Sequence, residues 1–203
     1  TKSITINYSA NGTGATISQT TQTGNYTFAG WDVSGMDSTT HTYGSYTTTN
    51  ATLSKTKETS FKNLRASSGT VTFAGNWTGP SLTLATVTKD NYTCKWVSDG
   101  LEKASGASYK PSSATTRNFN ASCTANTFTV KYHKNGGNGS MSNTTCTYDE
   151  DCVLRNNSFT KTGYRFGGWA TSASGSKVYN NQANVKNVKT SGTLNLYAVW
   201  VST

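Results

Sequence analysis

The chain has 203 residues and a formal net charge of +9, because 18 Lys and Arg residues face only 9 Asp and Glu residues. Only 33% of the residues are hydrophobic, but 11% are aromatic, which excludes the aromatic-poor composition typical of disordered chains. The basic residues are scattered without a cluster, so the charge predicts a basic soluble surface, or attraction toward acidic polymers, rather than specific nucleic-acid binding.

The first module that we expect covers residues 1–78. Residues 4–8 (Ile-Thr-Ile-Asn-Tyr) alternate as a strand does, and residues 10–14 (Ala-Asn-Gly-Thr-Gly) predict a turn with positive φ. An aromatic string follows at 25–31, and a closing strand ends the module. Between them, residues 55–65 are the only stretch that suggests a short helix.

The second expected module covers residues 79–126. It has neither an opening strand nor a glycine turn of its own. Residues 82–92 nevertheless repeat the spacing of residues 154–164, at a constant offset of 72 residues (154 less 82). We therefore interpret this segment as a truncated repeat of the third module.

The third expected module, residues 127–203, is the most complete. Its glycine-rich turn at 134–139 matches the turn at 10–14. Strands are expected at 128–132, on both sides of an acidic turn within 145–154, at 159–170 and at 193–200. The first module has additional segments that the third module lacks, and we expect these to form loops.

An aromatic pattern relates the three modules. Residues 163–169 (Gly-Tyr-Arg-Phe-Gly-Gly-Trp) share their Tyr, Phe, Gly and Trp with residues 25–31, and a weaker copy lies at 91–96. Such self-similarity is the signature of repeat architectures. Small domains bury little surface, so we expect the Trp residues at these fixed positions to form a thin core, although an exposed Trp that stacks on a sugar is the alternative.

Four cysteines allow three disulfide pairings. The offset of 72 places Cys94 where Phe166 lies, and alignment of the closing strands places Cys123 at Trp200. Two aromatic residues expected to meet in the third module are therefore both cysteine in the second. This double replacement favours a Cys94–Cys123 bond that stabilises the module by about 3 kcal/mol, and it leaves the other two cysteines to pair with each other.

The remaining pair, Cys146 and Cys152, flanks the acidic turn. Its spacing fits neither a redox motif nor a zinc ribbon. An even cysteine count in small Thr- and Asn-rich modules favours disulfides and hence an oxidising, extracellular compartment.

The third module resembles the Listeria-Bacteroides repeat, also called the internalin B B-repeat. The resemblance is carried by residues 130–137, 147–148, 159–169 and 196–200; it holds at both ends of the first module and in part of the second. It implies a small β-grasp-like module, found in tandem in bacterial surface and secreted proteins as a spacer or adhesive segment. The family supplies no catalytic residues to transfer.

Candidate chemical sites are few. The acidic residues 149–151 are the only carboxylate cluster, and we interpret them as a solvated turn rather than a calcium site. His41 and His133 lack the partner spacing of a triad. We therefore expect no catalytic residue, metal site or cofactor.

If aromatic residues bind a ligand, the best candidates are those outside the repeated pattern. Tyr43, Tyr46 and Tyr109 meet this criterion and are expected in loops. An exposed Tyr can stack on a sugar ring while Thr and Asn side chains bind its hydroxyl groups.

The sequence thus predicts a mostly β chain with little helix, built as three small β-grasp-like modules in an extended array. It lacks a membrane-spanning apolar run and a signal peptide, so it resembles a segment excised from a longer protein. We expect a non-enzymatic, extracellular stalk or adhesive region of a bacterial surface protein. Its partner would be a protein or glycan on a host or neighbouring cell surface; a carbohydrate-binding module, or an accessory region of a secreted enzyme, is the alternative.

Overall fold

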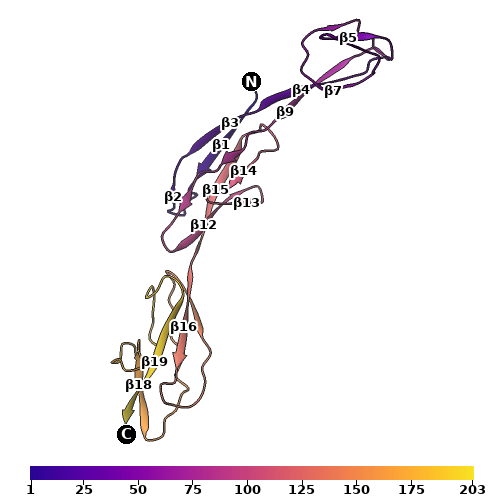
Figure 1. The fold of residues 1–203 in the computed structure, drawn as a ribbon. Helices are drawn as coiled ribbons and strands as arrows, with labels where there is room; N and C mark the ends of the chain where they lie inside the picture. Colours follow the sequence, from indigo (N-terminus) through magenta and orange to yellow (C-terminus); the bar gives the residue numbers. More distant parts are fainter. The chain divides into compact units, whose positions relative to one another are not determined.

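The computed structural model describes all 203 residues and contains strands but no helix (Figure 1). The prediction of a mostly β chain is confirmed. A five-stranded sheet has the order β13 (Leu101–Ala104), β12 (Tyr92–Ser98), β15 (Arg117–Ala125), β1 (Ser3–Ser9), β3 (Thr21–Asn25). A four-stranded sheet has the order β17 (Thr144–Thr147), β16 (Thr127–His133), β19 (Thr193–Ser202), β18 (Tyr164–Ala170).

Two three-stranded sheets lie between β3 and β10 in the sequence. Their orders are β7 (Leu53–Thr56), β4 (Thr27–Ser34), β9 (Thr72–Thr78), and β6 (Tyr46–Thr48), β5 (His41–Tyr43), β8 (Phe61–Lys62). The prediction of a short helix at 55–65 is therefore wrong, because this stretch includes the end of β7, in one sheet, and all of β8, in the other. Two further pairs join β10 (Leu82–Thr83) to β14 (Ser108–Tyr109) and β11 (Val87–Thr88) to β2 (Thr16–Ile17).

The chain divides into two compact units. The first comprises residues 1–9, 17–86 and 96–120, and the second comprises residues 10–16, 87–95 and 121–203. The five-stranded sheet is centred in the first unit and the four-stranded sheet lies in the second.

The four-stranded sheet is built on the alternation of β16. Phe128, Val130 and Tyr132 all point into the core, as a period of two requires. β16 pairs in parallel with β19, and the outer strands β17 and β18 pair antiparallel. Trp169, with 0% exposure, packs against Tyr132 with ring centroids 5.0 Å apart. A Tyr–Trp contact therefore forms the centre of this core.

The five-stranded sheet repeats this arrangement. β1 buries Ile4, Ile6 and Tyr8 and pairs in parallel with β15, although most of the chain's first half separates the two strands (Figure 1). Trp96, with 0% exposure, packs against Tyr8 with ring centroids 4.9 Å apart. The centre of this core is again a Tyr–Trp contact.

The two sheets agree in register and hydrogen bonding. Tyr8 lies opposite Phe119 across the parallel pair, as Tyr132 lies opposite Leu196. Each tyrosine hydroxyl accepts a backbone N–H, from Ala85 at 3.1 Å and from Arg155 at 2.9 Å. We call residues 1–25 with 79–126 the N-terminal repeat, and residues 127–203 the C-terminal repeat.

The turns after the opening strands also agree. Asn11 and Gly12 have φ of 54° and 70°, and Asn135 and Gly136 have φ of 46° and 82°. The positive φ predicted from the Asn-Gly sequences is therefore confirmed, and it explains why these turns require such residues.

The expected separation of residues 1–78 from residues 79–126 does not match this pairing. The second segment lacks an opening strand because β1, from the first segment, supplies it. Residues 27–78 carry their own sheets and form an insertion. Because Thr27 pairs directly with Thr78, the insertion returns the chain to the point where it left the repeat.

The insertion begins with a twisted ribbon of β4 and β9. Phe28 contacts Trp31 and Trp77 edge to face, with centroids 5.1 and 5.4 Å apart. Trp31 and Trp77 remain 36% and 38% exposed, so the prediction that the Trp residues at the repeated positions form a core is wrong for Trp31. Cross-strand aromatic pairs stabilise the ribbon.

A small core lies beyond the ribbon. Val33, Met36 and Leu53 are buried there, and Tyr43 and Phe61 pack against them. The insertion is therefore a folded element rather than the loop expected from the sequence.

Candidate functional site

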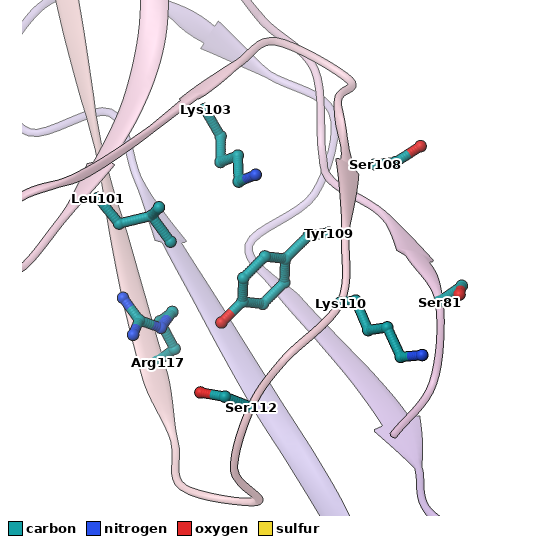
Figure 2. A pocket seen from close by; sticks show the side chains of 8 residues that line it. All are labelled: Ser81, Leu101, Lys103, Ser108, Tyr109, Lys110, Ser112 and Arg117. Carbon is teal, nitrogen blue, oxygen red and sulfur yellow. The ribbon is translucent and has the colours of Figure 1, made fainter. Parts of the chain in front are cut away.

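A hollow of about 600 Å³, lined mostly by residues with polar side chains, opens in the first unit beside β14 (Figure 2). Its lining comes from β13, β14, β15, the residue before β10 and the segment after β14. The lining residues are Ser81, Leu101, Lys103, Ser108, Tyr109, Lys110, Ser112 and Arg117.

Tyr109 lies at the centre of this hollow. Its backbone pairs with Leu82, and its ring packs edge to face on Phe119 with centroids 5.6 Å apart. The residue is only 8% exposed, and Figure 2 shows its hydroxyl directed toward Arg117 and Ser112. The hollow therefore meets the hydroxyl of Tyr109 rather than the face of its ring.

Arg117 is held in place by Ser98. Its Nη1 donates to the Ser98 carbonyl and to the Ser98 hydroxyl, each at 3.2 Å. Because Ser98 is buried, these two bonds fix the guanidinium at the wall of the hollow. Lys103 and Lys110 add positive charge, and no Asp or Glu is among the lining residues. Such a site favours an anion.

A second hollow, of about 510 Å³, lies in the insertion beside the β5–β6 hairpin. Tyr43 and Tyr46 line it, with their rings stacked at 5.6 Å between centroids and 28° between planes. Tyr46 is 59% exposed. The rest of the lining is mostly Thr, Ser and Asn, with Lys57 and Glu58 at one side.

The structure thus places all three candidate tyrosines at hollows, but it does not bring them together. Tyr43 and Tyr46 line one hollow and Tyr109 the other. The sequence predicted that these tyrosines lie in loops, and this prediction is wrong. Tyr43, Tyr46 and Tyr109 belong to strands β5, β6 and β14. Their role in binding remains a prediction.

The two disulfides of the structure join Cys94 to Cys123 and Cys146 to Cys152. This is the pairing that the double replacement favoured. Phe166 and Trp200, the residues used for that alignment, are opposite each other in the C-terminal repeat, with ring centroids 6.0 Å apart. The Cys94–Cys123 bond therefore stands where the other repeat has an aromatic pair.

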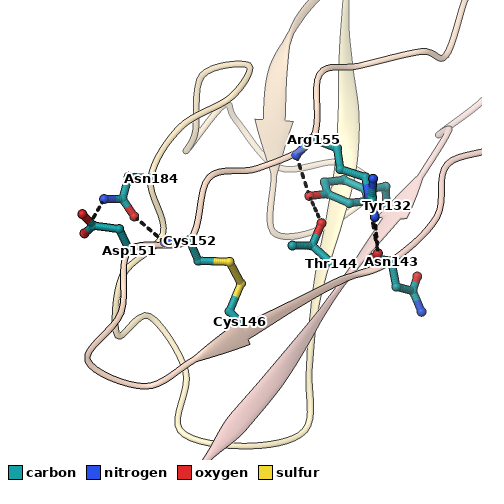
Figure 3. Close-up of a disulfide and its surroundings, with 8 residues drawn as sticks. All are labelled: Tyr132, Asn143, Thr144, Cys146, Asp151, Cys152, Arg155 and Asn184. Carbon is teal, nitrogen blue, oxygen red and sulfur yellow. Dashed lines mark hydrogen bonds between the residues drawn. A yellow bond between two sulfur atoms is a disulfide. The ribbon is translucent and has the colours of Figure 1, made fainter.

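Figure 3 shows how the second disulfide is supported. The Cys152 N–H donates to the Asn184 side chain at 3.0 Å, and the same Asn184 donates to Asp151 at 2.9 Å. The expected return strand after the acidic turn does not form, since Val153 makes only an isolated bridge to Asn184. Backbone bonds from Leu154 to Ala183 and from Val185 to Cys152 hold this stretch together with the side-chain bonds of Asn184.

The acidic turn is exposed but not merely solvated. The Tyr92 hydroxyl donates to Asp149 Oδ2 at 2.7 Å, and the Asn187 amide donates to Asp149 Oδ1 at 2.8 Å. These bonds, led by that from Tyr92, lower the pKa of the Asp149 carboxyl. The same contact raises the pKa of Tyr92. No group of three or more His, Cys, Asp or Glu side chains could hold a metal ion.

The two histidines lie apart. His41 is buried in the insertion, where its Nδ1 lies 3.3 Å from the Thr39 carbonyl oxygen. His133 stacks on Tyr197 at 4.5 Å between ring centroids, and its Nε2 lies 2.9 Å from Asn195 Oδ1.

Sequence reasoning missed Lys103 and Arg117 as site residues, because it counted them among scattered charges. A usable signal existed for Arg117. The alignment that pairs Phe119 with Leu196 also pairs Arg117 with Leu194, and thus sets a charge at an apolar position.

The structure holds no helix long and apolar enough to cross a membrane. No curated protein matched the chain. A family model did match, the Listeria-Bacteroides repeat domain, over residues 128–199. This match and the disulfides are consistent with an extracellular surface protein, and the repeat suggests a bacterial surface-associated repeat region. Residues 128–199, within the C-terminal repeat, are thus similar to the Listeria-Bacteroides repeat domain.

Proposed function

We propose that the chain is a non-enzymatic extracellular segment of a bacterial surface protein, acting as a stalk or adhesive repeat region. The observation that supports this most is the duplication. Two sheets share a parallel central pair, a Tyr–Trp core contact and a tyrosine hydroxyl that accepts a backbone N–H. Only the second sheet matches the repeat model, and we extend the β-grasp-like module to the first.

Hydrogen bonds inside the second unit surround Asn126, the last residue before the C-terminal repeat. Within the second unit, the Asn126 N–H donates to the Asn91 carbonyl at 2.9 Å, and the Asn126 carbonyl accepts the Tyr148 N–H at 2.9 Å. The Thr93 hydroxyl donates to Asn126 Oδ1 at 2.8 Å. Asn126 is thus hydrogen-bonded to residues on either side of it in the sequence.

The disulfides support an extracellular location, because thiols are kept reduced in most cytosols. The partners that we propose are a protein or glycan on a host or neighbouring cell, with acidic polymers attracted by the charge of +9.

Labelling of intact cells tests the proposal. Antibodies raised against the purified chain should bind unpermeabilised cells of the source bacterium, and protease treatment of those cells should remove the signal. Labelling only after permeabilisation, with free thiols at Cys94 and Cys123 in the native protein, would overturn it. An antibody to a cytosolic protein is the control for leakage.

A second candidate is a glycan-binding module, favoured by the stacked Tyr43 and Tyr46 at a hollow lined by hydroxyl groups. A glycan array tests it with the wild type and Tyr46→Ala. Because Tyr46 is mostly exposed, the substitution should leave the fold intact and remove specific signals. Equal signals from both proteins would contradict a role of this hollow.

A further inference from the structure

The hollow beside β14 lies where the two repeats differ most in chemistry. In the parallel pairs, Ile6 lies opposite Arg117 and Val130 lies opposite Leu194. Since β1 and β16 are equivalent, Arg117 takes the position of Leu194. Leu194 packs against the core of the C-terminal repeat, so the N-terminal repeat carries a guanidinium at an apolar position.

Tyr109 is a second replacement of this kind. In the N-terminal repeat, the backbone of Tyr109 pairs with that of Leu82. In the C-terminal repeat, the N–H of Val185 donates to the Cys152 carbonyl at 2.8 Å. Leu82 and Cys152 each lie three residues before the residue whose N–H donates to the core tyrosine. Tyr109 is therefore the counterpart of Val185, which is fully buried.

These two replacements converge on one place. The Tyr109 hydroxyl points toward Arg117, and the Lys103 side chain extends toward the Tyr109 ring from the opposite wall (Figure 2). Replacing buried aliphatic side chains by polar ones weakens a core unless the polar groups are bonded. The N-terminal repeat thus has a polar hollow where the other repeat has apolar side chains.

We propose that this hollow binds an anionic saccharide unit, a uronate or a sulfated sugar. Arg117 is held by Ser98 through Nη1 alone, so its other N–H groups can form a planar fork to a carboxylate or sulfate. Lys103 supplies a second charge, and Tyr109 with the surrounding serines supplies hydrogen bonds to ring hydroxyls.

The geometry distinguishes a sugar from a nucleic acid. Proteins that bind single strands stack bases on exposed aromatic faces. The ring of Tyr109 packs edge to face on Phe119 and is only 8% exposed, so it offers a hydroxyl and no stacking platform. The inference rests on the proposed adhesive role for its biological setting, but the binding itself can be measured on the purified chain.

Calorimetric titration of the full chain tests the site. The probes are a heparin-derived hexasaccharide, an oligogalacturonate and, as the uncharged control, maltohexaose, at about 0.15 M salt where distant charges are screened. Arg117→Leu and Tyr109→Val introduce the residues of the C-terminal repeat and should therefore fold, which hydrogen exchange of β12 and β15 verifies. Lys131→Thr, at an exposed position of β16, removes the same charge elsewhere.

We expect one anionic probe to bind, with a loss of about tenfold or more in affinity for Arg117→Leu and less than about twofold for Lys131→Thr. The probe that binds identifies the anion as sulfate or carboxylate. Equal weakening by both variants would overturn the site in favour of general charge attraction. Absence of binding by both anionic probes, or equal binding of maltohexaose, would also overturn it; so would equal binding of an oligothymidylate, titrated as a nucleic-acid control. None of these outcomes changes the cell-labelling result, so the two proposals can fail separately.

Discussion

The Cys94–Cys123 disulfide provides the sharpest test of the equivalence between the repeats. The bonded cysteines are 29 residues apart, and the chain-entropy relation gives a contribution of about 3.5 kcal/mol for a loop of this length. A variant with serine at both positions should lose approximately this stability in the N-terminal repeat.

A second variant should restore part of the loss. Cys94→Phe with Cys123→Trp copies the pair Phe166 and Trp200, whose rings meet edge to face at 6.0 Å between centroids. Such a pair is worth about 0.5–1.5 kcal/mol beyond the area that it buries, and half-burial of two large rings adds about 1–2 kcal/mol. We therefore expect this variant to recover about 2 kcal/mol relative to the serine variant.

Hydrogen exchange measured by mass spectrometry resolves the effect by repeat. Peptides from β12 and β15 report the N-terminal repeat, and peptides from β16 and β19 serve as an internal reference that should not change. If the aromatic variant exchanges as fast as the serine variant, positions 94 and 123 are not equivalent to 166 and 200, and the reasoning is refuted.

Two other contacts yield measurable predictions. Because the bond from Tyr92 lowers the folded pKa of Asp149 below the ordinary 3.8, its stabilising contribution is present above this value and is lost as the pH falls through the folded pKa. The difference in Tm between the wild type and Asp149→Asn should therefore narrow as the pH falls below 3.8, and a constant difference in calorimetry would contradict it. The Nε1 of Trp96 donates to the Ala85 carbonyl at 2.7 Å, whereas Nε1 of Trp169 is buried without a partner in the protein. Trp96→Phe should then cost about 2 kcal/mol more than Trp169→Phe, as measured by hydrogen exchange in each repeat, and equal costs would refute the difference.

Much of the fold was readable from local patterns. The alternation of β1 and β16, the Asn-Gly turns and the replacement of an aromatic pair by cysteines all involve neighbouring residues or a fixed offset. The discontinuity of the N-terminal repeat was not readable, because it depends on the parallel pairing of β1 with β15. Pairing between distant strands leaves no periodic signal in either strand.

A misleading match caused the error in module boundaries. Residues 25–31 imitate residues 163–169, but Trp31 belongs to the exposed ribbon of the insertion. The true counterpart of Trp169 is Trp96. Composition alone does not separate these cases, since aromatic residues serve both a packed core and a cross-strand ladder.

The constant offset of 72 residues between the second and third expected modules holds for only part of the segment. It fits Val87, whose counterpart Phe159 is likewise buried. It does not fit Leu82, because the hydrogen bond to the core tyrosine makes Leu84 the counterpart of Leu154. Two extra residues in the C-terminal repeat, between Leu154 and Phe159, shift the register, and only the hydrogen bonds reveal them.

The sequence predicted only some of the residues that line the hollow beside β14. Tyr109 was a candidate because it stands outside the repeated pattern, whereas Arg117 was overlooked because its charge was judged by local clustering. Comparison with the apolar position in the other repeat, rather than with neighbouring charges, is what identifies it.

The disulfide and the hollow have one explanation in common. The N-terminal repeat has lost apolar side chains at four positions, where it carries Cys94, Cys123, Tyr109 and Arg117. The polar groups of Tyr109 and Arg117 stand where the other repeat has apolar side chains, and this weakens a small core, which has little stability to spare. A covalent bond between β12 and β15 stabilises the sheet without requiring burial. If that bond compensates for the polar hollow, replacing both cysteines by serine should cost less stability in a chain that also carries Arg117→Leu and Tyr109→Val. The same two substitutions should abolish binding of the anionic saccharide.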